Sequence, residues 1–161
     1  MFENISENYL GNTLIGDTRK NAVDFFESLL ESGLQLERGT GYWSDKRYWM
    51  VKHNDEYICF ILINGGEDKT EPNGWVIWVD DDEQNCFAGL SSDERTKETA
   101  WKHIDICANC GGCKNPGGYR KTVFGKVFDK VCVTPMKFDN PDNETVGGVK
   151  KLVELHCKSS C

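Results

Sequence analysis

The chain has 161 residues, of which 39% are hydrophobic and 28% are charged, and its formal net charge is −7. This length and composition are typical of one globular domain and exclude a disordered or fibrous chain, so we expect a single domain over residues 1–161. An acidic chain repels a phosphate backbone, and we therefore expect no nucleic-acid partner.

The first residues indicate where the protein is located. The chain begins MFENISENYLGN, with acidic residues where a signal peptide carries basic ones, and no apolar stretch follows. No run in the sequence approaches the roughly 18 apolar residues of a membrane helix. The sequence therefore predicts a cytoplasmic protein that is not embedded in a membrane, in a compartment where thiols stay reduced.

The first half of the chain is predicted to form an arm, a helix and several strands. Residues 1–16 lack apolar periodicity, which is typical of an extended arm. Thr18 can cap a helix that continues to Ser32, because apolar residues follow at helical spacing and Gly33 ends it. Short turns then separate strand-like segments, and these cover residues 34–38, 47–53, 57–64 and 75–80. Such short connections predict an antiparallel meander.

The second half is predicted to form two helices and two strands. A helix is expected from Ser91 to Ile106, with the cysteine cluster directly after it. Segments 121–128 and 131–138 have the composition of strands, and an apolar stripe predicts a last helix over residues 144–156. Residues 157–161 are expected to be a frayed tail.

These elements together predict the fold class. Residues 57–63 are apolar on both faces, so this strand should be central and covered by helices. We therefore expect an α+β domain, with helices packed on one face of an antiparallel meander sheet and a cysteine-rich loop.

The most informative motif is Cys107-x2-Cys110-x2-Cys113, in a chain with eight cysteines. In a reducing compartment, clustered cysteines indicate metal or redox chemistry. Thiolates two residues apart can bind one ion, and the Gly-Gly pair after Cys110 favours the tight turn this requires. Cys132 is the best fourth ligand, because a strand returning from the loop would bring it back. The predicted metal ligands are thus Cys107, Cys110, Cys113 and Cys132.

Three interpretations of this cluster remain open. Structural zinc is preferred, because four thiolates suit a closed tetrahedral site. An iron–sulfur cluster ranks lower: ferredoxin-like C-x2-C-x2-C-x3-C-P runs are similar, but Gly117 occupies the fourth position here. Without metal, the thiols could serve redox chemistry in the positive field of Lys114 and Arg120. Of the other cysteines, Cys59 is expected in the core, Cys86 in a turn, and Cys157 and Cys161 in the frayed tail.

The segment CANCGGCKNPGGYRKTVFGKVFDKVC, followed by FDNPDNETVGGVKKLVEL, resembles a set of small uncharacterised bacterial proteins. Those proteins join a CxxCxxC loop to an FGKxFxxxC segment and a final helix after Asn-Pro-Asp. The resemblance covers residues 100–155, implies a compact α+β domain and transfers no catalytic residue. More distantly, the helix-then-meander order is similar to small-molecule-binding domains of the gyrase-inhibitor-like kind, at the level of fold alone.

Aromatic residues in the strand region form a second candidate site. The candidate ligand-binding residues are Trp43, Trp49, Tyr57, Trp75 and Trp78. Because side chains alternate along a strand, some of these rings must share a face, either lining a pocket or filling the core. Rings and nearby carboxylates favour a hydrophobic or cationic small molecule. The acidic run 80–83 lacks the spacing of a calcium loop and predicts a solvated turn.

No arrangement of serine, histidine and aspartate residues suggests a nucleophile, so no catalytic residue is assigned. The sequence favours a small-molecule-binding or sensor-type module with a structural zinc site. The alternatives are a thiol-redox protein that uses Cys107, Cys110 and Cys113, and a protein–protein interaction module.

Overall fold

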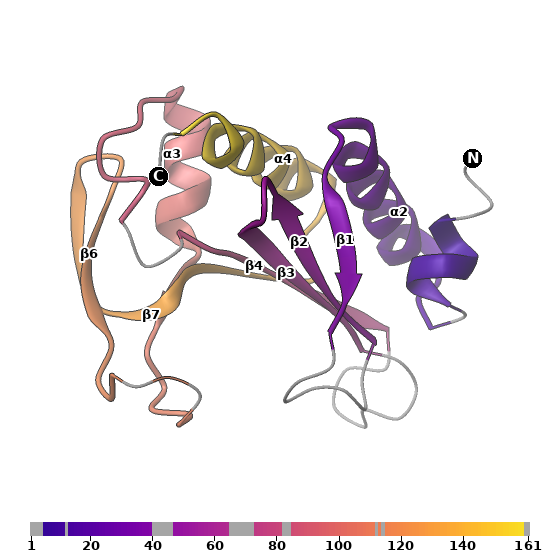
Figure 1. Ribbon diagram of the computed structural model, residues 1–161, viewed down its shortest axis with the longest axis horizontal. Helices are drawn as coiled ribbons and strands as arrows, with labels where there is room; N and C mark the ends of the chain where they lie inside the picture. The colour runs from indigo at the N-terminus through magenta and orange to yellow at the C-terminus, as the bar shows by residue number, and fades with distance from the viewer. Residues whose placement is uncertain are drawn as a thin grey trace.

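The computed structural model describes residues 5–11, 13–39, 47–64, 73–81, 85–111, 113 and 115–159. The helical elements are η1 (Ser6–Leu10), α2 (Gly16–Glu31), α3 (Glu94–Lys102) and α4 (Asn143–Lys158). The strands are β1 (Gln35–Arg38), β2 (Arg47–His53), β3 (Glu56–Asn64), β4 (Gly74–Val79), β5 (Ile104–Ile106), β6 (Tyr119–Val123) and β7 (Lys126–Asp139). Figure 1 shows α2 and α4 side by side over one face of the sheet.

The seven strands form one antiparallel sheet in the order β1-β2-β3-β4-β7-β5, with β6 also paired to β7. The first four strands are consecutive in sequence and in space, so the predicted α+β fold with an antiparallel meander is confirmed. Val131 of β7 pairs with Ile106 on one side and Tyr119 on the other. β6 therefore lies on the edge of β7 opposite β5, and Figure 1 shows it at the opposite end of the molecule from α2.

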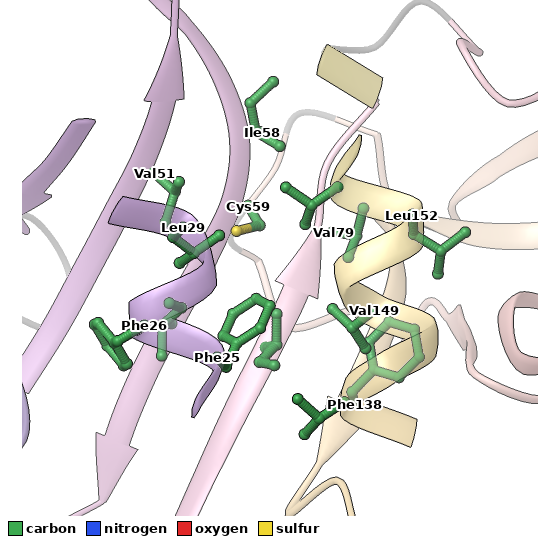
Figure 2. Close-up of a cluster of buried hydrophobic side chains, with 14 of the residues drawn as sticks. Phe25, Phe26, Leu29, Val51, Ile58, Cys59, Val79, Phe138, Val149 and Leu152 are labelled. Atoms are coloured by element: carbon green, nitrogen blue, oxygen red, sulfur yellow. The ribbon is translucent and has the colours of Figure 1, made fainter. Parts of the chain in front are cut away.

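The core lies between the sheet and two helices (Figure 2). Phe25, Phe26 and Leu29 of α2, each at most 1% exposed, pack against the sheet, as do the buried Val149 and Leu152 of α4. The sheet contributes side chains from alternate positions of neighbouring strands, and these include Val51, Cys59, Ile61, Ile77, Val79 and Phe138. Helices thus cover one face as predicted, and the period-2 pattern of the strands places the apolar set under them.

α3 packs on α4 rather than on the central strands. A methyl group at Gly148 would lie 2.8 Å from Cγ2 of Thr99, so a glycine in α4 allows the two helices to approach closely. Asp93 caps α3 by accepting a hydrogen bond from the backbone N–H of Thr96. The predicted helix start at residues 91–93 is therefore confirmed.

Two predicted elements have different ends in the structure. The helix expected to reach Ile106 ends at Lys102, and Ile104–Ile106 form β5, where β-branched side chains are favoured and β7 supplies backbone partners. Segment 121–128 is not one strand: Phe124 and Gly125 have φ values of +48° and +78° and reverse the chain between β6 and β7. Two left-handed residues are what a two-residue hairpin turn requires.

The ends of the described chain are also more ordered than predicted. Within the expected arm over residues 1–16, Ser6–Leu10 form a π-helical turn, and Leu10 is fully buried in the core. Within the expected tail over residues 157–161, α4 continues to Lys158, because Cys157 packs against the core. The local sequence did not predict the order of either segment, because the core residues that each segment contacts are distant in sequence. Among the described residues, no helix is long and apolar enough to cross a membrane.

Asp142 caps α4 by accepting a hydrogen bond from the backbone N–H of Thr145 at 2.8 Å, and this bond lowers the pKa of its carboxyl group. A carboxyl group with a lowered pKa stabilises the fold above its ordinary pKa, and that contribution is lost as the pH falls through the lowered value. We expect Asp142→Ala to lower the free energy of unfolding by about 1 kcal/mol at pH 7 and by less near pH 2.

Urea denaturation at the two pH values measures this difference. Glu98→Ala, which removes an exposed carboxylate within α3, serves as the control and should have little effect at either pH. An Asp142→Ala effect of equal size at both pH values would contradict a stabilising charge at this cap.

Candidate functional site

The cysteine loop connects β5 to β6 and is attached to β7 at its base. The backbone N–H of Cys107 donates to the carbonyl oxygen of Lys130 at 2.7 Å. At the other end of the loop, Gly118 lies against the backbone of Lys130 and Val131 and against Cβ of Cys107. The first cysteine is therefore fixed relative to β7, while the middle of the loop extends toward solvent.

The first turn of the loop directs a backbone donor at sulfur. The N–H of Asn109 donates to Sγ of Cys107 at 3.4 Å, and Asn109 has a φ of +54°. Gly111 also has a positive φ, +78°, so the chain curls around Cys110, which is exposed. In a metal site, such a backbone N–H group hydrogen-bonds the ligand sulfur and helps to orient it.

Two asparagines that the sequence analysis did not single out hold the loop together. Oδ1 of Asn109 accepts a hydrogen bond from the N–H of Gly117 at 2.7 Å, and Nδ2 of Asn115 donates to the carbonyl oxygen of Gly118 at 2.8 Å. Asparagine next to Gly and Pro is a turn signal, because its side chain bonds nearby backbone groups and it tolerates positive φ. That signal was present in the sequence at Asn115, which precedes Pro116, whereas Asn109 lies between Ala108 and Cys110.

The predicted fourth ligand, Cys132, lies on β7, the strand adjacent to β5. Its sulfur lies 3.6 Å from Oγ1 of Thr134 and hydrogen-bonds the carboxyl group of Asp105, whose pKa is raised by burial. Cys113 is half-buried, with its sulfur 3.8 Å from the carbonyl oxygen of Asn115. Among the described residues, no three metal-ligating side chains converge on one point.

The aromatic candidates are divided between the two faces of the sheet. Trp49 and Trp75 face the helices and are 9% and 1% exposed, whereas Trp78 faces the opposite side, where Nζ of Lys137 lies 5.8 Å from its ring centroid. The ring of Tyr57 lies tilted against that of Phe60, with centroids 5.6 Å apart, and Nζ of Lys52 lies 4.9 Å from the Tyr57 ring centroid. Trp43 lies outside the described residues. The described rings thus do not converge on one site, and Trp49 and Trp75 contribute to the core.

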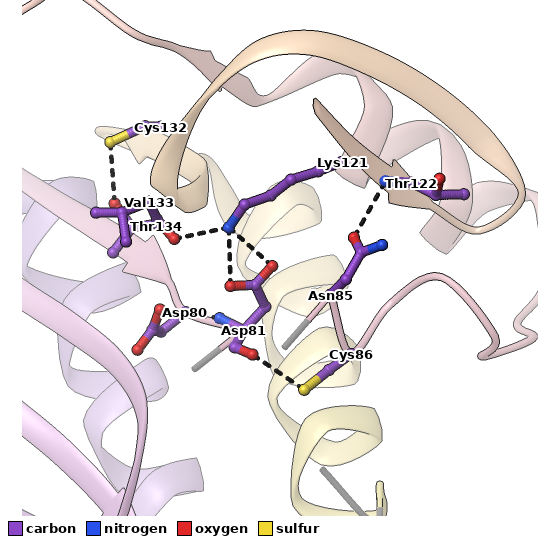
Figure 3. Close-up of polar contacts among 9 residues, drawn as sticks. All are labelled: Asp80, Asp81, Asn85, Cys86, Lys121, Thr122, Cys132, Val133 and Thr134. Carbon is purple, nitrogen blue, oxygen red and sulfur yellow. Dashed lines mark hydrogen bonds and ion pairs between the residues drawn. The ribbon is translucent and has the colours of Figure 1, made fainter. Parts of the chain in front are cut away.

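A buried ion pair joins the end of β4 to the β6–β7 hairpin (Figure 3). Nζ of Lys121 lies 2.9 Å from both carboxylate oxygens of Asp81 and also donates to the carbonyl oxygen of Val133 at 2.9 Å. Lys121 is 5% exposed, Asp81 2% and Asp80 8%. The expected solvated turn at residues 80–83 is therefore wrong for Asp80 and Asp81; residues 82–83 lie outside the described part.

Cys86 and Phe87, which follow this pair, are buried as well. Cys86, predicted to lie in a turn, is 6% exposed, and its sulfur lies 3.0 Å from the carbonyl oxygen of Asp81. The side chain of Asn85 accepts a hydrogen bond from the N–H of Thr122, and the N–H of Phe124 donates to the carbonyl oxygen of Phe87. Residues 85–87 therefore line the outer edge of β6, and the Lys121–Asp81 pair belongs to a packed junction.

Comparisons of the chain with family models, with curated proteins and with solved structures found no match. Function is therefore inferred from the residues and contacts of this chain, and the cysteine loop offers the most specific chemistry among the described residues.

Proposed function

We propose that this protein is a metal-binding module in which Cys107, Cys110, Cys113 and Cys132 hold a structural zinc ion. The observation that carries the proposal is the turn at Cys107, where the N–H of Asn109 already points at the sulfur at 3.4 Å. All four cysteines carry free thiols. Sulfur ligands in this number suit Zn²⁺, which prefers four-coordinate tetrahedral sites.

Zinc binding would close the loop rather than fill a finished cavity. Cys107 and Cys132 lie on neighbouring chain segments, whereas the exposed Cys110 lies in the loop and has to move toward them. A metal site is rarely complete without its ion, so the binding free energy contributes to ordering the loop and to folding. The ion would thereby tie the loop to β7.

Native mass spectrometry of freshly purified protein tests the stoichiometry, and we expect one zinc ion per chain. Cys110→Ser should abolish zinc retention, while its effect on the metal-free fold should be small because Cys110 is exposed. Cys157→Ser is the matched control: this free cysteine lies on α4, away from the loop, so zinc retention should persist.

Thermal unfolding provides a second readout of the same site. Removing zinc with a chelator should lower Tm, because a structural ion stabilises the folded chain by mass action. Re-addition of zinc should restore Tm in the native protein and in Cys157→Ser but not in Cys110→Ser. An unchanged Tm after verified metal removal, or zinc retained by Cys110→Ser, would contradict the proposal.

A further inference from the structure

A groove of about 450 Å³ lies between the C-terminal halves of α2 and α4. Ser28, Leu29 and Ser32 form the α2 wall, Val153 and Cys157 belong to the α4 wall, and Leu34 and His53 close the end near the β2–β3 turn. The volume falls within the range of about 300 to 1,000 Å³ that is typical of small-molecule sites. None of these residues belongs to the cysteine loop.

Part of the lining of the groove is apolar. Leu29, Leu34 and Val153 are buried and, with the half-buried Cys157, form the apolar part of its lining. Burial, with a smaller contribution from Glu154, raises the pKa of the Cys157 thiol. A protonated thiol acts as a small apolar group, so this part of the lining offers apolar surface to a ligand.

The charged side chains that line the groove balance, with two lysines, Lys150 and Lys158, and two glutamates, Glu31 and Glu154. Nζ of Lys150 lies 2.6 Å from a carboxylate oxygen of Asp24, and Nζ of Lys158 lies 2.7 Å from one of Glu154. A phosphate or carboxylate ligand would have to compete with these carboxylates for the lysines, and a cation would have to compete with the lysines. Balanced charges therefore favour an uncharged ligand.

A polar hollow of about 360 Å³ continues from the same end of the groove. It shares Ser32 and His53 with the groove, and Gln35, Asn54 and Asp55 are among its other lining residues. Hydrogen-bonding side chains therefore lie next to the apolar part of the groove, at the end that carries Ser32 and His53. A molecule that fills both spaces needs an apolar body and a hydrogen-bonding end.

We infer that the groove between α2 and α4 binds an uncharged amphipathic small molecule, with its apolar body against Leu34, Val153 and Cys157 and its hydrogen-bonding end at His53. This site is separate from the proposed zinc site and does not depend on it. It also differs from the aromatic pocket predicted from the sequence, because none of the tryptophans that the structure describes lines it.

Fluorescence titration with Nile red tests the site, since this dye is uncharged, amphipathic and brighter in apolar surroundings. Cys157→Trp fills the groove and should weaken Nile red binding at least about tenfold. Lys151→Trp places the same side chain on an exposed position of α4 outside the groove, so it should bind the dye as the native chain does. Equal affinity of the two variants would overturn the inference.

Alkylation of the native chain gives a readout that needs no substitution. After chelator treatment, Nile red should slow the modification of Cys157 by N-ethylmaleimide, measured by peptide mass spectrometry, and leave that of the exposed Cys110 unchanged. Equal rates at Cys157 with and without dye would overturn the inference. The anionic dye anilinonaphthalene sulfonate and the cationic dye thioflavin T should protect Cys157 less, and stronger protection by either would overturn the assignment of an uncharged ligand.

Discussion

Lys121→Met should lower the free energy of unfolding by about 3–5 kcal/mol, because it leaves the carboxylate of Asp81 buried without its ammonium partner. Nζ of Lys121 contacts both oxygens of that carboxylate at 2.9 Å, and both residues are at most 5% exposed. Urea denaturation at pH 7 measures the loss. The pair closes the junction between β4 and the β6–β7 hairpin, so the hairpin should also show the largest increase in amide hydrogen exchange.

The double variant Lys121→Met with Asp81→Leu tests whether the stability lost in Lys121→Met comes from the buried charge of Asp81. Replacing both charges by apolar groups of similar size removes the uncompensated charge, so stability should recover above that of Lys121→Met alone. Lys150→Met is the control for an exposed pair, since Lys150 and Asp24 are 31% and 46% exposed, and it should cost less than about 1 kcal/mol. A similar loss in Lys121→Met and Lys150→Met would contradict the role assigned to the buried pair.

Gly118→Ala should be the most damaging small substitution in the cysteine loop. A methyl group there would lie 2.6 Å from the carbonyl carbon of Lys130, 2.7 Å from the oxygen of Val131 and 2.8 Å from Cβ of Cys107, and φ is +80°. Strain and overpacking together should lower the free energy of unfolding by about 2–4 kcal/mol. Because Cys107 must shift, the variant should also retain less zinc in native mass spectrometry.

Gly117→Ala is the matched control for this substitution. Gly117 has a φ of +90°, but a methyl group there would meet no atom of the described residues within 4 Å. It should therefore incur only the backbone strain, about 1 kcal/mol, and leave zinc retention unchanged. If urea denaturation gave equal losses for the two variants, close packing of the loop on β7 would not be the reason for glycine at position 118.

Several elements followed from local sequence patterns. Helix α2, the first four strands and the capped start of α3 were predicted close to their observed bounds, because period-3.6 and period-2 apolar patterns and a capping aspartate act over a few residues. Strand alternation also accounts for Trp75 and Trp78 pointing to opposite faces of the sheet. The cysteine spacing identified the candidate metal loop, but it did not predict where the sulfur atoms lie relative to one another.

The sequence by itself determined the fold class and most elements, whereas the tertiary structure decided how distant segments meet. Asp81 was expected in a solvated turn because its neighbours in sequence are acidic. In the structure its carboxylate is buried in an ion pair with Lys121, which lies forty positions later in the sequence. Ile104–Ile106 were expected to end a helix, but they form a strand because β7 provides backbone partners for them. The groove likewise exists only because α2 and α4, from opposite ends of the chain, pack side by side (Figure 1). The burial of a side chain, the pairing of a strand and the shape of a groove all depend on residues that folding brings close from distant parts of the sequence. Local periodicity carries no information about those distant residues.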